Sequence, residues 1–481
     1  MSLIKYKIFL QNFLILVKRN GWFCICIVIS LLFSVLSKNW YFWLIFELIS
    51  FFILIFYFSK GFKNPLNIHS AAISFIILYS IPSTILILQN KILLKNNELL
   101  TLFSVIGIGL ISYTLGVLFV KKLFFFEKKK NTLLSKKLNK IFWLSYQYRY
   151  ILTVIVCIVL VFWGFMPRGM SYKESVIYRM QTTGMVQYFK ILIPVIFSAL
   201  MIAMISIIGD LKKHKKLSLL SYILILLVIL CIIGGHRIWI IALFTCLILS
   251  FKPYLKRKHL LLIILLAFFS TFLISGAIRY ARSGESLTEN VKKFYEYSLE
   301  TKNMNFEKLM WGWSSLNSPF STFITIIKNI PQNINFDYSA YIKDFSLLIP
   351  KTIYSKRPLP YNQWYVKTFE PEIFQIGGGK TFYVLGFGYL FAGHIGVLIH
   401  LFLFGALFEW LRKFFKMING AAGLFLYSYF FIQLVKFAVS AGFIVFIKTS
   451  LFLDFFIPII LLFIFTLVIN SLNLKKFNIL K

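Results

Sequence analysis

The chain has 481 residues, 59% of them hydrophobic, and a mean hydropathy of +0.80. This composition excludes an ordinary soluble protein and predicts a polytopic membrane protein. The net charge of +36 comes from 52 Lys and Arg residues against 16 Asp and Glu residues. Because the positive charge clusters beside apolar runs, as it does in cytoplasmic membrane loops, we exclude nucleic-acid binding.

Apolar windows of roughly 20 residues, the length of a helix that crosses a bilayer, predict about 12 transmembrane helices and an all-α fold. In chain order they lie at 21–37, 40–59, 71–90, 101–120, 150–166, 190–209, 217–234, 238–251, 259–278, 386–408, 421–444 and 450–471.

Clusters of lysine and arginine predict the orientation, because such clusters are enriched on the cytoplasmic side. The stretch 121–149 holds nine basic residues and one acid. With this loop in the cytoplasm, strict alternation places the other basic clusters there as well, and both termini are expected to be cytoplasmic. These clusters are the N-terminal region, 210–216, 252–258, 411–416 and the C-terminal "LKKFNILK".

The predicted spans divide the chain into five segments. Two outer loops, a short one at 167–189 and a long one at 279–385, separate three groups of helices. The long loop is expected to carry helices at the membrane surface, because a connector of this length is seldom passive. The helix groups are spans 1–5 in 1–166, spans 6–9 in 190–278 and spans 10–12 in 386–481.

Arginine is distributed differently from lysine. Four of the ten arginines fall on the predicted cytoplasmic side, whereas six fall outside, against the trend that lysine follows. Since a guanidinium group binds phosphate through paired hydrogen bonds and keeps its charge, these six predict an anion site at the outer rim. The structural alternative is snorkelling towards lipid head groups. The six are Arg168, Arg179, Arg237, Arg279, Arg282 and Arg357, with Lys351, Lys356 and Lys380 as further phosphate ligands.

The run "GGGKT" at 377–381 is not a nucleotide-binding loop. A Walker A motif requires glycine where this chain has Phe374. On the predicted outer side, the only two carboxylates spaced closely enough to suggest a metal site are Glu370 and Glu372, and Pro371 separates them. We therefore expect neither a metal ion nor another cofactor. The later glycines Gly393 and Gly396 are expected to allow close helix packing.

Three charged residues lie within predicted spans, where an ionised group is costly unless it is paired. They are Glu47, Lys436 and Asp454. Because the spans that carry Lys436 and Asp454 are neighbours in sequence, we expect these two side chains to form a pair.

A family resemblance rests on "IPKTIYSKRPLP" at 349–360, a glycine stretch, and "TFYVLGFGYLFAGHIGVL" at 381–398, which opens a late span. These segments resemble the O-antigen and capsule repeat-unit polymerases of the Wzy type. The pattern of about a dozen spans with two arginine-bearing outer loops is similar to that family as well. The resemblance implies an integral-membrane glycosyltransferase of the bacterial inner membrane, with its active site facing the periplasm.

The resemblance also implies the substrates. The donor would be a glycan on undecaprenyl pyrophosphate, and the acceptor would be a sugar hydroxyl of another repeat unit on the same carrier. A flippase and a chain-length regulator of the same pathway would be partners. The outer arginines and lysines would then hold the pyrophosphates, and the expected absence of a metal leaves this charge stabilisation to them.

The acceptor hydroxyl requires a base or a hydrogen-bond acceptor. The candidates are His236, Glu285 and Glu372, with Glu174 as another. Each glutamate is equally compatible with a solvated loop carboxylate. His394 and His400 are expected to be structural.

Two other functions remain open from the sequence. A ligase that transfers finished polymer to lipid A core would share this architecture. A lipid-linked oligosaccharide flippase or transporter would also suit a dozen spans, although transporters usually show internal repeats and short loops.

Overall fold

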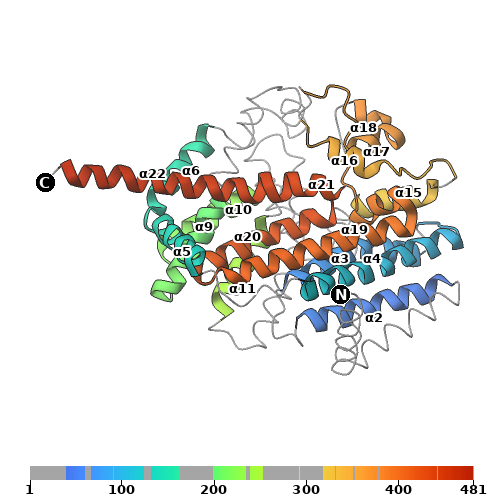
Figure 1. Cartoon of the computed structure of the whole chain (residues 1–481), viewed down its shortest axis with the longest axis horizontal. Coiled ribbons are helices and arrows are strands. Elements are labelled where there is room, and N and C mark those ends of the chain that lie inside the picture. Colours follow the sequence, from blue (N-terminus) through green and yellow to red (C-terminus); the bar gives the residue numbers. More distant parts are fainter. Residues whose placement is uncertain are drawn as a thin grey trace, which may run out of the picture.

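The protein is described by a computed structural model over residues 39–59, 67–89, 92–123, 132–162, 199–233, 239–252, 292, 318–330, 332–349, 353–375, 380–440 and 442–479. Within these ranges the chain is all-helical and contains no strand, as the sequence predicts. Figure 1 shows an elongated helix bundle with helices α15–α18 at one end and α5 and the C-terminal part of α22 at the other.

Six of the described helices are long and apolar enough to cross a membrane. Each coincides with a predicted span, which confirms a multi-pass helical character. They are α2 (Trp40–Phe58), α3 (Ile68–Leu88), α4 (Asn96–Leu123), α19 (Val384–Met417), α20 (Gly420–Ala438) and the continuous run of α21 (Phe443–Phe446), η3 (Ile447–Phe456) and α22 (Ile457–Ile479).

Shorter helices complete the described bundle. Two of them, α10 and α11, occupy the predicted spans at 217–234 and 238–251 but fall short of a full crossing in length. The predicted spans at 21–37 and 259–278 lie outside the described residues. The shorter helices are α5 (Thr132–Gln147), α6 (Arg149–Phe162), α9 (Ala199–His214), α10 (Leu219–Ile233), α11 (Trp239–Phe251), α15 (Ser318–Asn329), α16 (Ala340–Ser346), α17 (Tyr361–Phe369) and α18 (Pro371–Gln375).

Helices α4 and α19 lie closest together because each presents a glycine to the backbone of the other. A Cβ atom on Gly116 would lie 2.1 Å from the carbonyl oxygen of Phe402, and one on Gly405 would lie 2.0 Å from that of Tyr113. Ser112 also donates a hydrogen bond across this contact to the Leu398 carbonyl. Small residues allow this approach, which is the usual way apolar helices gain packing contact in a membrane.

A buried chain of polar side chains ties α3, α4 and α19 together. His69 makes hydrogen bonds with the Tyr113 hydroxyl at 3.0 Å and with the Glu409 carboxylate at 2.7 Å. Arg412 donates to both oxygens of Glu409, each at 2.5 Å. His69, Tyr113 and Glu409 are almost wholly buried, so each is satisfied by its neighbours, as an apolar interior requires.

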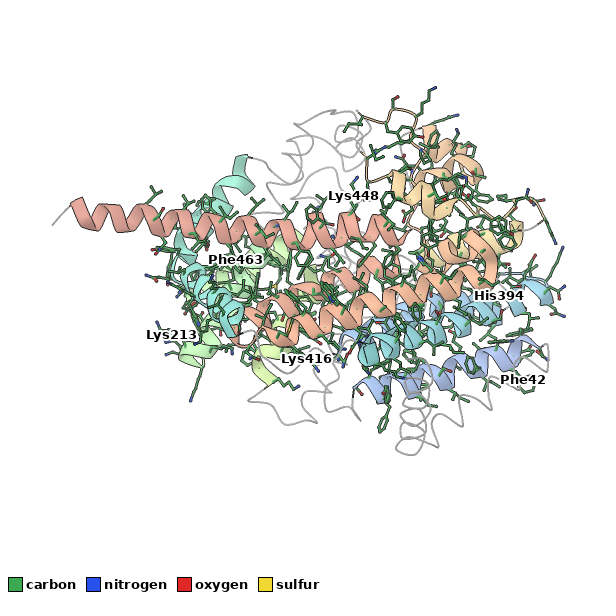
Figure 2. The ribbon with its side chains drawn as sticks, viewed as in Figure 1. Phe42, Lys213, His394, Lys416, Lys448 and Phe463 are labelled. Carbon is green, nitrogen blue, oxygen red and sulfur yellow. The ribbon has the colours of Figure 1, made fainter. Side chains whose placement is uncertain are left out.

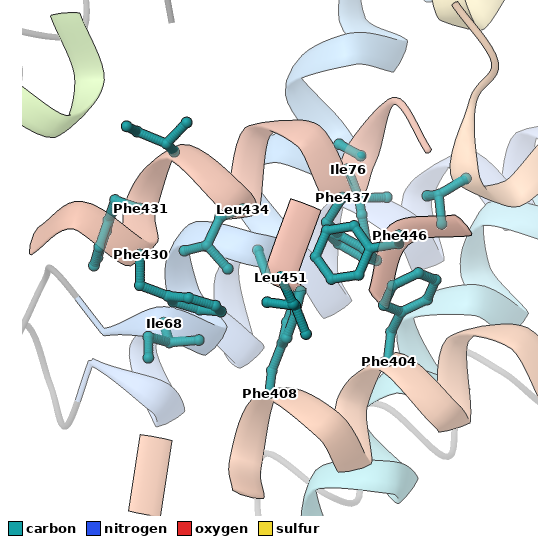
Figure 3. Close-up of a cluster of buried hydrophobic side chains, with 14 of the residues drawn as sticks. Ile68, Ile76, Phe404, Phe408, Phe430, Phe431, Leu434, Phe437, Phe446 and Leu451 are labelled. Atoms are coloured by element: carbon teal, nitrogen blue, oxygen red, sulfur yellow. The ribbon is translucent and has the colours of Figure 1, made fainter. Parts of the chain in front are cut away.

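Phenylalanine fills the space between α19, α20 and α21, as Figure 3 shows. The Phe404 ring lies 4.6 Å from that of Phe437 and 5.2 Å from that of Phe446, measured between centroids. The Phe408 ring lies 5.0 Å from that of Phe437. Tilted and edge-on contacts of this kind are favourable for aromatic rings. These contacts join α19 and α20, which are adjacent in sequence, to α21, which begins after a break in the helix.

Helix α19 is not one straight span, because its helical geometry is interrupted at Ala392 and Gly393. A Cβ atom on Gly396 would lie 2.1 Å from the carbonyl oxygen of Gly388. In a straight helix these residues would be roughly 12 Å apart, so the chain must fold back. We call residues 384–391 the short arm and residues 394–417 the long arm of α19. The span predicted at 386–408 therefore contains a turn that hydropathy alone does not reveal.

The turn between the two arms explains three of the glycines. Gly393 has a φ of +59°, a conformation that favours glycine. Gly388 and Gly396 allow the two arms to touch, which confirms the expected close packing at Gly396. Tyr383, just before the short arm, donates a hydrogen bond of 2.7 Å to the Ile76 carbonyl in α3. The short arm is thus anchored among the other helices.

The break between the last two spans lies earlier than predicted. Helix α20 ends at Ala438, and α21 begins at Phe443, so the expected connection at 445–449 is helical. The reason is a tertiary contact, since the Asp344 carboxylate accepts hydrogen bonds from the backbone N–H groups of Ile444 and Val445 at 2.8 and 3.4 Å. A side chain from a distant segment thereby caps the start of α21.

The predicted pair between the last two spans is formed. Lys436 Nζ on α20 lies 2.5 Å from Asp454 Oδ2 on η3, and the two side chains are 28% and 34% exposed. Tyr429 also donates a hydrogen bond to the Asp454 carbonyl at 3.2 Å. The pair neutralises two charges within helices that are otherwise apolar, which confirms the hypothesis from the sequence.

We expect Gly396→Val to disrupt the turn of α19, because the new Cβ would overlap the Gly388 carbonyl, a backbone atom that cannot rotate away. Overpacking of this kind costs about 1–3 kcal/mol or more. The thermal unfolding midpoint of detergent-purified protein should fall clearly. Gly386→Ala is the matched control, because its Cβ would meet no atom closer than 3.5 Å. Equal midpoints for the two variants would contradict the described turn.

Charge exchange tests the Lys436–Asp454 pair. Lys436→Asp and Asp454→Lys should each lower the yield and the unfolding midpoint, because each places two like charges side by side. The double variant should recover part of both losses. A double variant as unstable as the sum of the two single variants would show that the pair does not contribute.

Candidate functional site

Four of the thirteen predicted site residues belong to the described part of the chain. They are Lys356, Arg357, Glu372 and Lys380, and no hydrogen bond or ion pair among the described contacts joins any two of them. The remaining nine lie outside the described residues. These are Glu174, His236, Glu285, Arg168, Arg179, Arg237, Arg279, Arg282 and Lys351.

Arg357 belongs to an assembly of short helices at one end of the bundle. We call the described residues of 318–375, with helices α15–α18, the cap. Its inner face is aromatic, since the Tyr361 ring lies 5.0 Å from that of Phe387 and the Phe323 ring lies 5.6 Å from that of Tyr383. Phe387 lies in α19 and Tyr383 directly precedes this helix, so the cap packs against the short arm.

Asp337 fastens the cap to the turn of α19. Its backbone N–H donates to the Leu390 carbonyl at 2.8 Å, and its carboxylate accepts bonds from Ser339, Lys343 and Tyr361 at 2.6, 2.8 and 2.9 Å. Burial opposes ionisation, but the three donors hold the pKa of Asp337 below its usual value. Asp337 is therefore an ionised anchor whose charge Lys343 neutralises.

Asp344, seven residues further along and within α16, is held differently. Its side chain is fully buried, and it accepts bonds only from the N–H groups of Ile444 and Val445, through Oδ2. The other oxygen has no donor and faces Gly442, where a Cβ atom would lie 2.3 Å away. Burial raises the pKa of Asp344 to about 6, although the two N–H groups act against this.

His400 lies beneath the cap on the long arm of α19. Its Nδ1 is 2.7 Å from the Tyr341 hydroxyl, and its Nε2 is buried without a partner. The ring packs 4.9 Å from that of Phe387 and 5.1 Å from that of Phe404. His394, at the turn, makes a hydrogen bond of 2.8 Å with Ser104. Both histidines thus join helices to one another, in agreement with the structural role expected for them.

Arg357 is half-exposed at the rim of the cap. Its Nη1 donates to the Ile349 carbonyl at 3.1 Å. A second cation, Lys448 of η3, is close enough for the charge of Arg357 to act on it. Figure 2 shows Lys448 at the same end of the bundle as the cap. Lys448 itself donates to the Leu347 carbonyl at 2.6 Å. The rim therefore holds two positive charges from segments far apart in sequence.

Sequence reasoning missed Lys448 because it took residues 445–449 as an unremarkable connection between two spans. A signal was present, since Lys448 is a cation in the short predicted outer connection between two apolar spans. Two of the other predicted residues, Lys380 and Glu372, make no contact with Arg357 among the described contacts. Lys380 is paired with the Glu370 carboxylate, and Glu372 is exposed on α18.

Large apolar side chains are exposed in the segments that hold the two cations. Leu348, Ile349, Ile353 and Tyr354 are 36%, 39%, 78% and 41% exposed. A rim that combines exposed apolar side chains with unneutralised cations is suited to an amphiphile with an anionic head group. Among the described residues, no group of three or more His, Cys, Asp or Glu side chains could hold a metal ion.

The buried Asp344 carboxyl should make stability depend on pH. Its pKa is about 6 in the folded protein, whereas an exposed aspartate has a pKa of about 3.9. The neutral group therefore stabilises the fold fully below about pH 4, and this contribution is lost as the pH rises through 6. As the pH is raised from 4 to 7, the unfolding midpoint of the detergent-purified wild-type protein should fall relative to that of Asp344→Asn. A constant difference between the two proteins would contradict this assignment.

A family relationship covers the part of the chain that carries the cap. The family described as "Domain of unknown function (DUF8712)" matches residues 170–481, well over half of the chain. No curated protein matches the chain, and no solved structure matches it either. The chain therefore belongs to the DUF8712 family, a domain of unknown function.

Proposed function

We propose that the protein polymerises lipid-linked oligosaccharide repeat units at the periplasmic face of the bacterial inner membrane. It would be a glycosyltransferase that moves a glycan from undecaprenyl pyrophosphate to a sugar hydroxyl of another repeat unit on the same carrier. The observation that carries this proposal is the position of Arg357, in the resembling segment 349–360, at an apolar rim beside a second cation.

The proposed topology has about 12 spans with both termini in the cytoplasm. The charges at the end of the bundle opposite the cap support this orientation. Lys136, Lys137 and Lys140 of α5 and Lys213 of α9 are exposed there, and Figure 2 labels Lys213 at that end. Because exposed lysines favour the cytoplasmic side, the cap would face the periplasm.

The proposed reaction breaks the bond between the anomeric carbon and the pyrophosphate oxygen. The acceptor hydroxyl oxygen forms the new bond to that carbon, and its proton passes to a base. Negative charge grows on the departing pyrophosphate, so a fixed guanidinium group such as that of Arg357 would lower the barrier. Among the candidate bases, Glu372 is exposed on α18 and accessible to an acceptor from the periplasm.

A flippase would supply the repeat units to the periplasmic face, and a chain-length regulator would act on the product. No cofactor enters the proposed reaction, since the energy of the bond to pyrophosphate drives the transfer. A ligase acting at the same face would use the same donor, so the product distinguishes the two enzymes.

Arg357→Ala should leave the protein in the membrane but reduce polymer formation roughly 100-fold or more, as the loss of a preorganised charge donor does. The measurement is the length distribution of glycan formed from lipid-linked repeat units by purified protein. Lys328→Ala is the control, because Lys328 is an exposed cation elsewhere in the cap. Unchanged chain lengths with Arg357→Ala would remove Arg357 from the site, and absence of transfer by the wild type would refute the polymerase proposal.

A further inference from the structure

The cations of the cap and of the segments beside it differ in their partners. Lys343 and Lys380 each have a carboxylate partner, Asp337 for the first and Glu370 for the second. Arg357 and Lys448 form no ion pair with any described residue, and backbone carbonyl oxygens hold both of them. Among the described residues, Lys328, Lys356 and Lys367 of the cap also lack an ion pair, but Arg357 and Lys448 are the two cations that neighbouring carbonyl groups hold beside one another.

Three consecutive carbonyl groups hold the two cations. Lys448 Nζ lies 2.6 Å from the Leu347 oxygen and 3.5 Å from that of Leu348, and Arg357 Nη1 lies 3.1 Å from that of Ile349. These carbonyls follow the end of α16, where a helix favours positive charge. The carbonyls fix the position of the cations without neutralising them. Most of the five N–H donors of Arg357 remain available for a ligand.

The nearest carboxylate of α16 does not serve as a counter-ion. Asp344 is turned towards the N–H groups of Ile444 and Val445 and is fully buried. Arg357 and Lys448 are partly exposed and repel one another. An anion bound between them would remove this repulsion, and a phosphate or diphosphate has the oxygen atoms to accept from both.

Lys448 is also in an unusual backbone setting. It lies in η3, a π-helical segment from Ile447 to Phe456. Such segments are rare and often lie at functional sites. Leu348, Ile349, Ile353 and Tyr354 expose apolar surface beside the cations. An anion recognised here would therefore suit a head group attached to a hydrocarbon chain better than a free ion.

We infer that Arg357 and Lys448 together bind the phosphate or diphosphate head group of a lipid, with the exposed apolar side chains of Leu348, Ile349, Ile353 and Tyr354 against its chain. The inference deepens the proposed function and rests on it for the polyprenyl identity of that lipid. It assigns Lys448, a residue of the last helical run, to the same site as Arg357 of the cap.

Binding to full-length protein in nanodiscs of neutral lipid tests this site. The probes are undecaprenyl diphosphate, undecaprenol and inorganic pyrophosphate. Arg357→Gln and Lys448→Gln should each weaken binding of undecaprenyl diphosphate roughly 10-fold or more, as the loss of a charge-assisted hydrogen bond does. Lys448→Arg should retain binding, because it keeps the charge. Lys328→Gln and Lys367→Gln are matched controls that each remove an exposed cation elsewhere in the cap, and they should bind like the wild type.

Two results would overturn the inference. One is an equal loss of affinity in the controls, which would indicate a general effect of charge. The other is binding of inorganic pyrophosphate as tight as that of the lipid diphosphate, which would show that the chain is not recognised. Unfolding midpoints of every variant separate lost binding from lost folding, and Lys448→Arg decides the matter if Lys448→Gln does not fold.

The polymerase assay with the same variants separates the two proposals. Binding that depends on Arg357 and Lys448 in a protein that forms no polymer supports the lipid site and refutes the polymerase. Polymer formation that is unaffected by both substitutions, in proteins that still bind the lipid diphosphate normally, refutes the site and leaves the polymerase standing.

Discussion

Inside an apolar helix bundle a polar group must find its partner within the protein, because neither water nor a lipid head group reaches it. His69, Tyr113, Glu409 and Arg412 satisfy one another across α3, α4 and α19. Lys436 and Asp454 do the same between α20 and η3. These contacts are specific in a way that phenylalanine packing is not, so they determine which faces of the helices meet.

The same requirement explains the surplus of positive charge at the cap. Asp337 is occupied by Lys343, Ser339 and Tyr361, while Asp344 is buried against the start of α21. Each aspartate serves the attachment of the cap to the bundle. Neither is left to neutralise Arg357 or Lys448, which take backbone carbonyls instead. The use of carboxylates for structure thus leaves two cations at the rim available for a ligand.

Among the described residues that the sequence suggested for the site, Arg357 lies beside a second cation, Lys448. Arg357 was recognisable because arginine departs from the distribution that lysine follows. Lys448 was not, because its role depends on α21 beginning at Phe443, and Asp344 sets that beginning from about 100 residues away. Lys380 looked equally suitable, yet Glu370 neutralises it, a partner that spacing along the chain does not identify.

The sequence by itself determined the all-helical architecture and the approximate position of each described span. Hydropathy over roughly 20 residues is a local property, and a helix satisfies its own backbone wherever it lies. Only the tertiary structure decided the turn within α19, the start of α21 and the meeting of Arg357 with Lys448. Each of these features depends on contacts between separate segments, such as that of Gly396 with Gly388 or of Asp344 with Ile444. Such contacts arise only when the segments pack together, so no single stretch of sequence signals them.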